Sequence, residues 1–229
     1  MIAVIIPAHN EAAGIGRCLA SIAEAAGHPG LSGEAVVTVV ALDDCSDDTA
    51  AHCHRPGVVT TCVQARCVGI ARACAAELAL AMGARWIAST DADSRVPPDW
   101  LAGQLGSNSD VFCGMVAVED WLDYPESVQR AYSQGHRLRD GHRHVHGANL
   151  GISAQAYRRC GGFLPLACGE DVALVDALAA AGHRIAWQAR PLVLTSARRY
   201  ARAPGGFSKF LQQLEQEAGS VALLQQARG

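Results

Sequence analysis

The chain has 229 residues, of which 50% are hydrophobic, and its formal net charge is −3. This composition supplies a core for one domain, and the charge gives no basic field of the kind that attracts nucleic acid. No apolar run approaches the ~20 residues that a membrane-spanning helix needs, and the first residues resemble a strand rather than a signal peptide. We therefore expect a soluble, cytoplasmic protein with no nucleic-acid partner and no transmembrane segment; peripheral contact with a membrane is left open.

Strand and helix patterns alternate through the first half of the chain. Short apolar, β-branched runs predict strands over residues 2–6, 36–42, 58–63 and 85–90, and helical periodicity predicts helices over 11–26 and 69–82. Acidic residues at 47–48 suit the start of a further helix. Alternation of this kind indicates a parallel sheet with helices on both faces.

The alternation weakens in the second half. We expect a fifth strand that begins near residue 110 and ends at 119–121, a polar helical stretch over 125–139 and a strand over 142–152. A helix over 170–181, short strands over 184–187 and 192–195, and a terminal helix over 208–224 complete the pattern. The terminal helix carries an apolar stripe of Phe207, Phe210, Leu211 and Leu214, which is expected to pack on the domain or on a partner subunit.

Two aspartates stand one residue apart at the end of the predicted fourth strand. Asp91 and Asp93 thus lie at the carboxyl edge of the sheet, where open α/β sheets bind their ligands. Carboxylate oxygens are the ligands that hard divalent cations prefer, and such cations take further ligands from substrate phosphates. Alone, the motif is weak, because similar acids occur in ordinary turns.

Other polar residues follow the first two predicted strands. Asp43 and Asp44 can accept hydrogen bonds from a nucleoside, and Arg72 in the third helix is placed to meet a phosphate. Gly14 and Gly16 do not open a dinucleotide-binding turn, because Leu19 occupies the third glycine position, and no P-loop motif is present.

Taken in order, these motifs resemble those of the GT-A fold family 2 glycosyltransferases. The resemblance covers roughly residues 2–195, and it rests on Pro-Ala-His-Asn-Glu at 7–11, Asp-Asp-Cys-Ser-Asp-Asp-Thr at 43–49, Gly-Ile-Ala-Arg at 69–72, Asp-Ala-Asp-Ser at 91–94, Pro-Asp-Trp-Leu at 98–101, Gly-Ala-Asn-Leu-Gly-Ile at 147–152, Gly-Gly-Phe at 161–163 and Gly-Glu-Asp-Val-Ala-Leu at 169–174. An ordered series is far more specific than any one of its motifs.

The resemblance implies a single α/β domain of the GT-A fold, with a mostly parallel, Rossmann-like central sheet and helices on both faces. Residues 1–118 would form the half that binds the nucleotide sugar, residues 119–205 the acceptor-side half, and residues 206–229 a C-terminal helix. The implied activity is metal-dependent transfer of a hexose from a UDP- or GDP-linked donor to a hydroxyl acceptor, with inversion at the anomeric carbon.

The resemblance also implies a role for individual residues. Asp171 would be the general base, with Glu170 as the next candidate, and Asp93 with Asp91 would hold Mg²⁺ or Mn²⁺. The donor would be bound by Ala8, Glu11, Asp43, Asp44, Arg72 and Asp91, and the acceptor side would include His146, Asn149, Trp121, Arg198 and Arg199. Independently of the resemblance, Asp171 stands at a predicted helix start, where the helix dipole stabilises an ionised carboxylate.

The sequence departs from the family pattern at several positions. Cys45 replaces the usual glycine after the acidic pair, and Ala73 replaces the asparagine that commonly follows the arginine. Many relatives also carry a late histidine as a metal ligand, and this chain has Arg198 and Arg199 in that region. Either the cation relies on Asp93, diphosphate and water, or the arginines supply part of the positive charge.

The stretch from 127 to 159 is basic, with six arginines and four histidines against one acid, Asp140. In a strand, His142, His144 and His146 would share one face, and we favour a role in lining the acceptor pocket over a zinc site, because no fourth ligand is evident. The basic stretch leaves an anionic acceptor open, and the apolar stripe leaves a homodimer through the C-terminal helix open. The alternative functions are a nucleotidyltransferase and a non-catalytic nucleotide-sugar-binding protein of the same fold.

Overall fold

The computed structural model describes residues 1–199 and 205–226, without the side chains of 219–226. The strands are β1 (Ile2–Ala8), β2 (Val36–Asp43), β3 (Val58–Val63), β4 (Trp86–Ser89), β5 (Val111–Val118), β6 (Leu150–Ser153) and β7 (Ile185–Thr195). The α-helices are α1 (Ala12–Ala26), α2 (Thr49–His52), α3 (Val68–Ala81), α4 (Trp100–Gly106), α5 (Glu126–Gly135), α6 (Ala154–Arg159), α7 (Glu170–Ala180) and α8 (Phe207–Gln226). Two 3₁₀ turns, η1 (Pro29–Leu31) and η2 (Gly147–Asn149), are also present.

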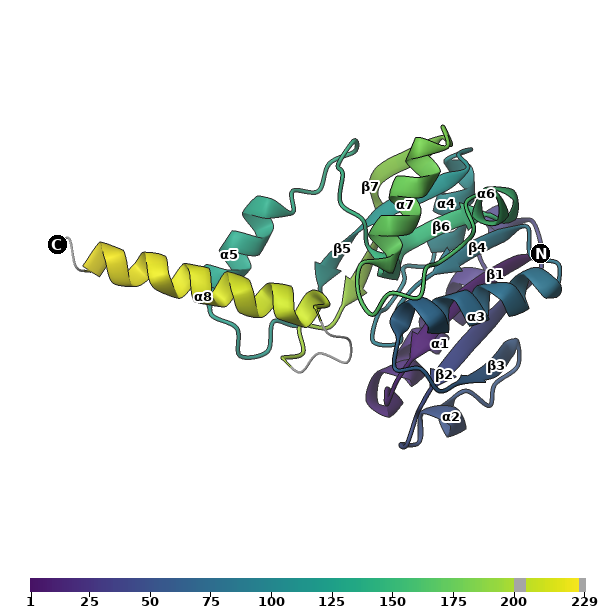
Figure 1. Ribbon diagram of the computed structural model, residues 1–229, viewed down its shortest axis with the longest axis horizontal. Helices are drawn as coiled ribbons and strands as arrows, with labels where there is room; N and C mark the ends of the chain where they lie inside the picture. Colours follow the sequence, from purple (N-terminus) through teal and green to yellow (C-terminus); the bar gives the residue numbers. More distant parts are fainter. Residues whose placement is uncertain (200–204, 227–229) are drawn as a thin grey trace.

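All seven strands form one sheet in the order β3-β2-β1-β4-β6-β5-β7. The first four strands are parallel to one another, and β5 is parallel to β7. β6 is the exception, because it runs antiparallel between β4 and β5 and so joins the two halves of the chain in one sheet. The expected mostly parallel sheet with helices on both faces is confirmed (Figure 1).

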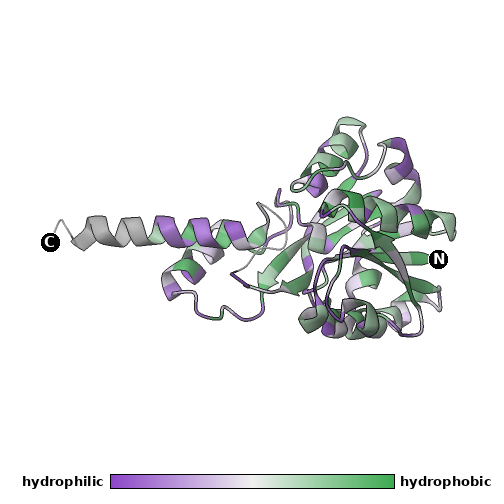
Figure 2. Cartoon of the chain, turned by 60° about the horizontal axis from the view of Figure 1, so that its bottom comes forward, coloured by the Kyte–Doolittle hydropathy of each residue, from purple (hydrophilic) through white to green (hydrophobic). Residues whose placement is uncertain are grey.

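The alternation of side chains along β1 divides the core into two layers. Ile2, Val4 and Ile6 point to the face covered by α1, where they pack with residues such as Ile15. The residues between them point to the opposite face, which α3 and α7 cover with small and branched apolar side chains. The helices lie on the two sides of the strands in Figure 1, and the strands are mostly hydrophobic in Figure 2. A parallel strand buried on both faces needs this near-continuous apolar sequence.

Two expectations for the second half were wrong. Residues 139–146 contain no strand. The strand β6 begins only at Leu150 and pairs with β4 and β5 over few residues. The ring of His142 is buried against the backbone, with Nε2 3.2 Å from the carbonyl oxygen of Gln188. The three alternating histidines therefore do not share one face of a strand. The two short strands expected over 184–187 and 192–195 are one long strand, β7, whose register with β5 shifts between Gly114 and Val116.

α5 and α8 lie side by side and project away from the sheet (Figure 1). Between them lies a small apolar cluster, which we call the satellite cluster: Tyr124, Val128, Tyr132, Ala197 and Leu211, with Phe207 and Leu214 packed against it. The apolar stripe of the C-terminal helix therefore packs on α5 of the same chain. A homodimer through this helix stays a prediction.

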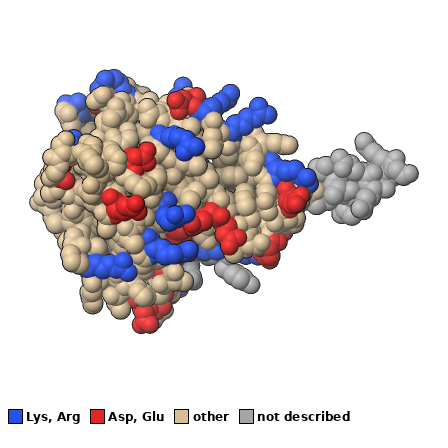
Figure 3. All heavy atoms as spheres, turned by 180° about the vertical axis from the view of Figure 1, so that it is seen from behind, with Lys and Arg blue, Asp and Glu red and all other residues tan. Residues whose placement is uncertain are grey.

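None of the helices in the described part of the chain is long and apolar enough to cross a membrane. Basic and acidic side chains are interspersed on the face that Figure 3 shows, in keeping with the small net charge.

Candidate active site

A cavity of about 700 Å³ opens at the carboxyl ends of the parallel strands. Its walls come from the ends of β1 and β2, the loop after β4, the N-terminal turns of α3 and α7, the loop before η2, and the first turn of α8. This volume lies within the range of ~300–1,000 Å³ that is usual for small-molecule sites. The cavity lies where the strand order predicts a ligand, because β1 connects to strands on both of its sides.

The predicted donor-side residues do not all reach the cavity. Ala8, Glu11 and Asp43 line it. Both carboxylate oxygens of Asp43 accept backbone N–H groups, from Ala65 at 2.8 Å and Cys67 at 2.8 Å among others, so this side chain fixes the loop between β3 and α3. Asp44 is exposed outside the cavity lining, where it pairs with Arg66.

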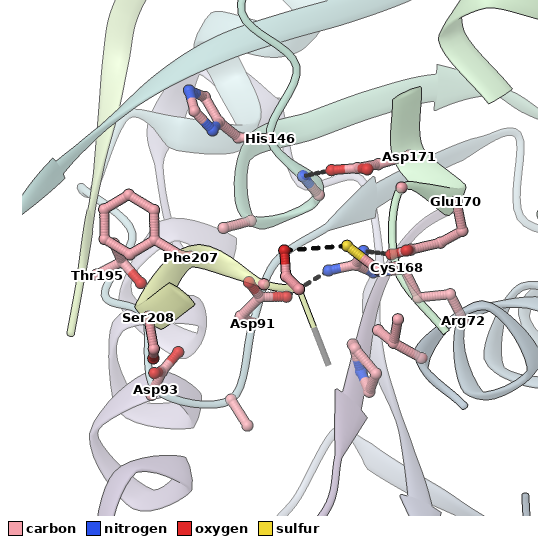
Figure 4. Close-up of a pocket in the computed structure, with 18 of the residues that line it drawn as sticks. Arg72, Asp91, Asp93, His146, Cys168, Glu170, Asp171, Thr195, Phe207 and Ser208 are labelled. Carbon is pink, nitrogen blue, oxygen red and sulfur yellow. Dashed lines mark hydrogen bonds and ion pairs between the residues drawn. The ribbon is translucent and has the colours of Figure 1, made fainter. Parts of the chain in front are cut away.

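Arg72 lies at the centre of a buried ionic cluster, which we call the Arg72 cluster. Its guanidinium binds the carboxylates of Asp91 and Glu170, and its side chain is only 4% exposed (Figure 4). Burial opposes its charge, but the two carboxylates outweigh burial and raise the pKa of Arg72. Burial raises the pKa of Glu170, which Arg72 counteracts. The cluster ties α3, the end of β4 and the start of α7 together.

Gly147 leaves room for this cluster. A Cβ atom at this position would lie 2.1 Å from Nη1 of Arg72, closer than any non-bonded contact allows. The backbone N–H of Gly147 donates to Oδ2 of Asp171 at 2.6 Å. One glycine therefore places the loop against both Arg72 and the predicted base.

Arg198 forms a second ionic cluster, the Arg198 cluster, on the opposite side of Asp91. Nη1 of Arg198 lies 2.6 Å from a carboxylate oxygen of Glu11 and 3.4 Å from Oδ2 of Asp93. Burial raises the pKa of Asp93 to about 7, the Arg198 charge lowers it, and the neighbouring acids Asp91 and Glu11 raise it further. With 29% of its side chain exposed, Arg198 is more open than Arg72.

Asp171 begins α7 and faces the cavity (Figure 4). Besides the bond from Gly147, its Oδ1 accepts the N–H of Val172 at 2.9 Å. Two backbone donors therefore hold the Asp171 carboxylate in place at the N-terminal end of α7. Each carboxylate oxygen keeps a further lone pair, so Asp171 can still accept a proton.

Three histidines line the cavity beyond Asp171: His136, His144 and His146. Burial lowers the pKa of His146 to about 3, and burial also lowers the pKa values of His136 and His144. These rings are therefore neutral near pH 7. The sequence pattern had grouped His142 with this wall, but His142 turns away and His136 from the end of α5 takes its place.

Three predicted acceptor-side residues lie outside the cavity lining. Trp121 packs edge-on against Tyr132 in the satellite cluster. Asn149 is fully buried, and its amide nitrogen donates to the carbonyl oxygens of Met115 and Pro191. Arg199 binds Asp123 and Glu215 outside the cavity. Of the two late arginines, only Arg198 lines the cavity.

Several residues that line the cavity were not predicted from the sequence. Cys168, Phe207 and Ser208 form part of the wall in Figure 4. Phe207 was visible in the sequence as part of the apolar stripe, yet nothing in the stripe indicated that the start of α8 would return to the strand ends.

The family profile of glycosyl transferase family 2 matches residues 3–159, which is well over half of the chain. The chain belongs to glycosyl transferase family 2. The resemblance drawn from the ordered motifs is thus confirmed, and the ends of the first parallel strands and the two aspartates lie within the matched segment. The remaining walls of the cavity lie beyond residue 159.

Solved structures share the fold of this chain. S. aureus TarS 1-349 in complex with UDP-GlcNAc aligns with a TM-score of 0.64 at 15% identity, over 95% of this chain and 66% of that chain. The mannosyltransferase PcManGT from Pyrobaculum calidifontis, in complex with GDP-Man and Mn²⁺, aligns with a TM-score of 0.61 at 18% identity, over 100% of this chain and 75% of that chain. The chain spans only 60% of another TarS 1-349 chain. No curated protein sequence matches it.

The acids of the Arg198 cluster fit a hard divalent cation. Glu11 and Asp93 of this cluster and Asp91 of the Arg72 cluster all line the cavity, and Arg198 is the positively charged group that lowers the pKa of Asp93. Burial is the main cause of the raised pKa of Asp93, and the charges of Asp91 and Glu11 add to it; a bound cation would favour the ionised carboxylate. Oxygen donors are the ligands that Mg²⁺ and Mn²⁺ prefer.

Proposed function

We propose that this glycosyltransferase moves a sugar from a UDP- or GDP-linked donor to a hydroxyl acceptor, with Asp171 as the general base and inversion at the anomeric carbon. One observation carries the proposal: a carboxylate held by backbone donors faces the same cavity as the two strand-end aspartates. The complexes of TarS with UDP-GlcNAc and of PcManGT with GDP-Man and Mn²⁺ support a donor of this class.

On this proposal the donor lies along residues 1–118 and the acceptor enters from the side of residues 119–205. Ala8 and Glu11 would contact the nucleoside, and Asp93 with Asp91 would hold Mg²⁺ or Mn²⁺ beside the diphosphate. When bound, that cation would offset the negative charge of the departing nucleoside diphosphate. Arg198 would add a second positive charge at the same place.

Asp171 would act on the acceptor. As the acceptor oxygen attacks the anomeric carbon, its proton moves to the Asp171 carboxylate and the bond from that carbon to the diphosphate oxygen breaks. Glu170 is a weaker candidate for the base, because its carboxylate is buried and bound to Arg72. The bond between Glu170 and Arg72 would instead fix the start of α7 and so the position of Asp171.

The test is Asp171→Asn, which nearly preserves shape and removes the proton acceptor. Turnover, measured as release of UDP or GDP from UDP-GlcNAc or GDP-Man with water or an added alcohol as acceptor, should fall by ~10²–10⁴-fold. Donor affinity measured by calorimetry should stay within a few-fold of the parent, because the donor contacts lie elsewhere.

Asp176→Asn is the matched control, since Asp176 is exposed on the same helix, α7. It should leave both turnover and affinity unchanged. Turnover near the parental rate in Asp171→Asn would remove Asp171 from the mechanism, and equal loss in both variants would assign the effect to the helix rather than to the base.

A further inference from the structure

The described part of the chain contains one group of three side chains arranged to hold a metal ion, and it is separate from the aspartate pair. The group consists of His136, His144 and His146, whose candidate ligand atoms all lie within 4.8 Å of one another. A tetrahedral zinc site with Zn–N distances of about 2.1 Å places its nitrogen atoms about 3.4 Å apart. The three nitrogen atoms are therefore close enough for one ion to bind all of them once the imidazole rings reorient.

The second observation is an unsatisfied nitrogen atom. Nε2 of His146 is buried and has no hydrogen-bond partner among the described residues. Buried polar atoms are normally paired, so an orphaned imidazole nitrogen indicates that something outside the protein chain binds there. A neutral imidazole presents one nitrogen lone pair, and that lone pair can bind a metal ion.

The third observation is the orientation of His136. Nδ1 of His136 lies 3.3 Å from the backbone carbonyl oxygen of Tyr132, one turn earlier in α5. A histidine that ligates a metal commonly donates its other N–H to a carbonyl in this way, which fixes the tautomer and leaves Nε2 free. Stacking holds the ring in place, since its centroid lies 4.3 Å from that of Tyr132 and 4.6 Å from that of His144.

We propose that His136, His144 and His146 form a second metal site, specific for a borderline ion such as Zn²⁺ that prefers imidazole nitrogen. Hard ions such as Mg²⁺ prefer oxygen, so the histidine site and the acidic site would select different metals. This inference replaces the expectation from sequence that the histidines only line the acceptor pocket. That expectation grouped His142 with the cluster, whereas the structure supplies His136 as the third ligand.

Three protein ligands leave a coordination position free, as in catalytic rather than structural zinc sites. All three histidines line the cavity, so an oxygen atom from the cavity could complete the coordination. If the proposed function holds, that oxygen would come from the acceptor, because Asp171 and the histidines lie on the same side. The metal site itself does not depend on that function.

The experiment is a calorimetric titration of the untagged, metal-free full chain with Zn²⁺. We expect one Zn²⁺ per chain in the parent and in Asp93→Asn. Mutation of a residue that only orients a metal ligand typically lowers metal affinity by ~10–100-fold. Removal of a ligand itself, in His136→Ala or His144→Ala, should therefore lower the affinity for Zn²⁺ by at least ~100-fold. Visible absorption on replacement with Co²⁺ would report four-coordinate ligation, and circular dichroism would show that each variant is folded.

His54→Ala is the matched control, because His54 is exposed and distant in sequence from the cluster. It should bind Zn²⁺ as the parent does. Absence of stoichiometric binding in the parent would overturn the proposal, as would parental affinity in the folded His136 and His144 variants. Loss of Zn²⁺ binding in Asp93→Asn together with its retention in both histidine variants would assign the ion to the aspartates and overturn it too. None of these outcomes requires sugar transfer, so the failure of the proposed function would leave the result interpretable.

Discussion

The Arg72 cluster and the Arg198 cluster each place an arginine in the wall of one cavity, and each arginine binds two carboxylates. Only 4% of the Arg72 side chain is exposed, whereas 29% of the Arg198 side chain is exposed. The Arg72 cluster joins α3, the loop after β4 and the start of α7. Arg198, in the segment after β7, instead binds Glu11 just before α1. In the Arg72 cluster the arginine–carboxylate contacts hold structural elements together. In the Arg198 cluster the same kind of contact leaves the arginine more accessible from the cavity.

The largest expected effect is on folding stability. Removing one partner of a buried ion pair leaves an uncompensated charge and costs ~3–5 kcal/mol. Arg72→Met should therefore lower the free energy of unfolding in urea by about that amount. Arg198→Met should cost less, because the Arg198 side chain is more exposed and Asp93, whose pKa is already about 7, can take up a proton.

Equal losses in the two variants would remove the distinction between the clusters. A double variant, Arg72→Met with Glu170→Gln, sharpens the test, because neutralising the stranded carboxylate should recover part of the loss. The difference between the double variant and the sum of the single variants measures the coupling directly.

A smaller effect is expected at Gly147. In Gly147→Ala the added methyl group meets the guanidinium of Arg72, and overpacking of this kind costs ~1–3 kcal/mol. The backbone N–H that binds Asp171 would move with the loop, so turnover should fall as well. Urea denaturation and nucleotide release measure the two effects.

Gly106→Ala is the control for Gly147→Ala. Nothing lies within 4 Å of a Cβ atom at Gly106 among the described residues. This variant should lose no stability, since alanine favours a helix over glycine. A neutral Gly147→Ala would show that the Arg72 cluster has room to move.

The smallest expected effect is the pH dependence of cation binding at Asp93, a residue of the Arg198 cluster but not of the Arg72 cluster. The pKa of Asp93 is raised to about 7, so below pH 7 this carboxylate is increasingly protonated and cannot bind a cation. Mn²⁺-dependent binding of UDP or GDP should weaken as the pH falls, by at most about tenfold per pH unit. Calorimetry across about pH 5.5–8.5, with EDTA and Asp93→Asn as controls, measures this dependence.

The charge of Arg198 lowers the pKa of Asp93. Arg198→Gln should therefore move the midpoint of the profile to higher pH. A profile that is flat in the parent, or a midpoint that Arg198→Gln leaves in place, would contradict the role given to the Arg198 cluster.

Much of the fold could be predicted because its signals are local. Apolar runs such as that before Asp91 marked the buried parallel strands, and the acids after those strands marked the sheet edge where the cavity opens. The ordered motifs added the family. These features depend on residues close together in the chain, so the sequence shows them directly.

The partners of the site residues could not be predicted. Arg72 meets Glu170 across 98 positions of the chain, and Arg198 meets Glu11 across 187. No periodicity encodes such pairs, since they arise only when α7 and the segment after β7 return to the strand ends. Asn149 was predicted to lie on the acceptor side because it belongs to a motif typical of the family. Its side chain instead donates hydrogen bonds to two backbone carbonyl oxygens in the core.

The family profile ends at residue 159, yet later segments close the cavity: the start of α7, the end of β7 and the first turn of α8. Apart from the edge strand β7, the sheet is complete by residue 159, and the cavity walls added later are loops and element ends. Substitutions there can reshape this wall of the cavity with little effect on β4 and the loop that carries Asp91 and Asp93. On the proposed function, a change of acceptor would thus be accessible by small steps, whereas a change of donor would require altering the sheet edge itself.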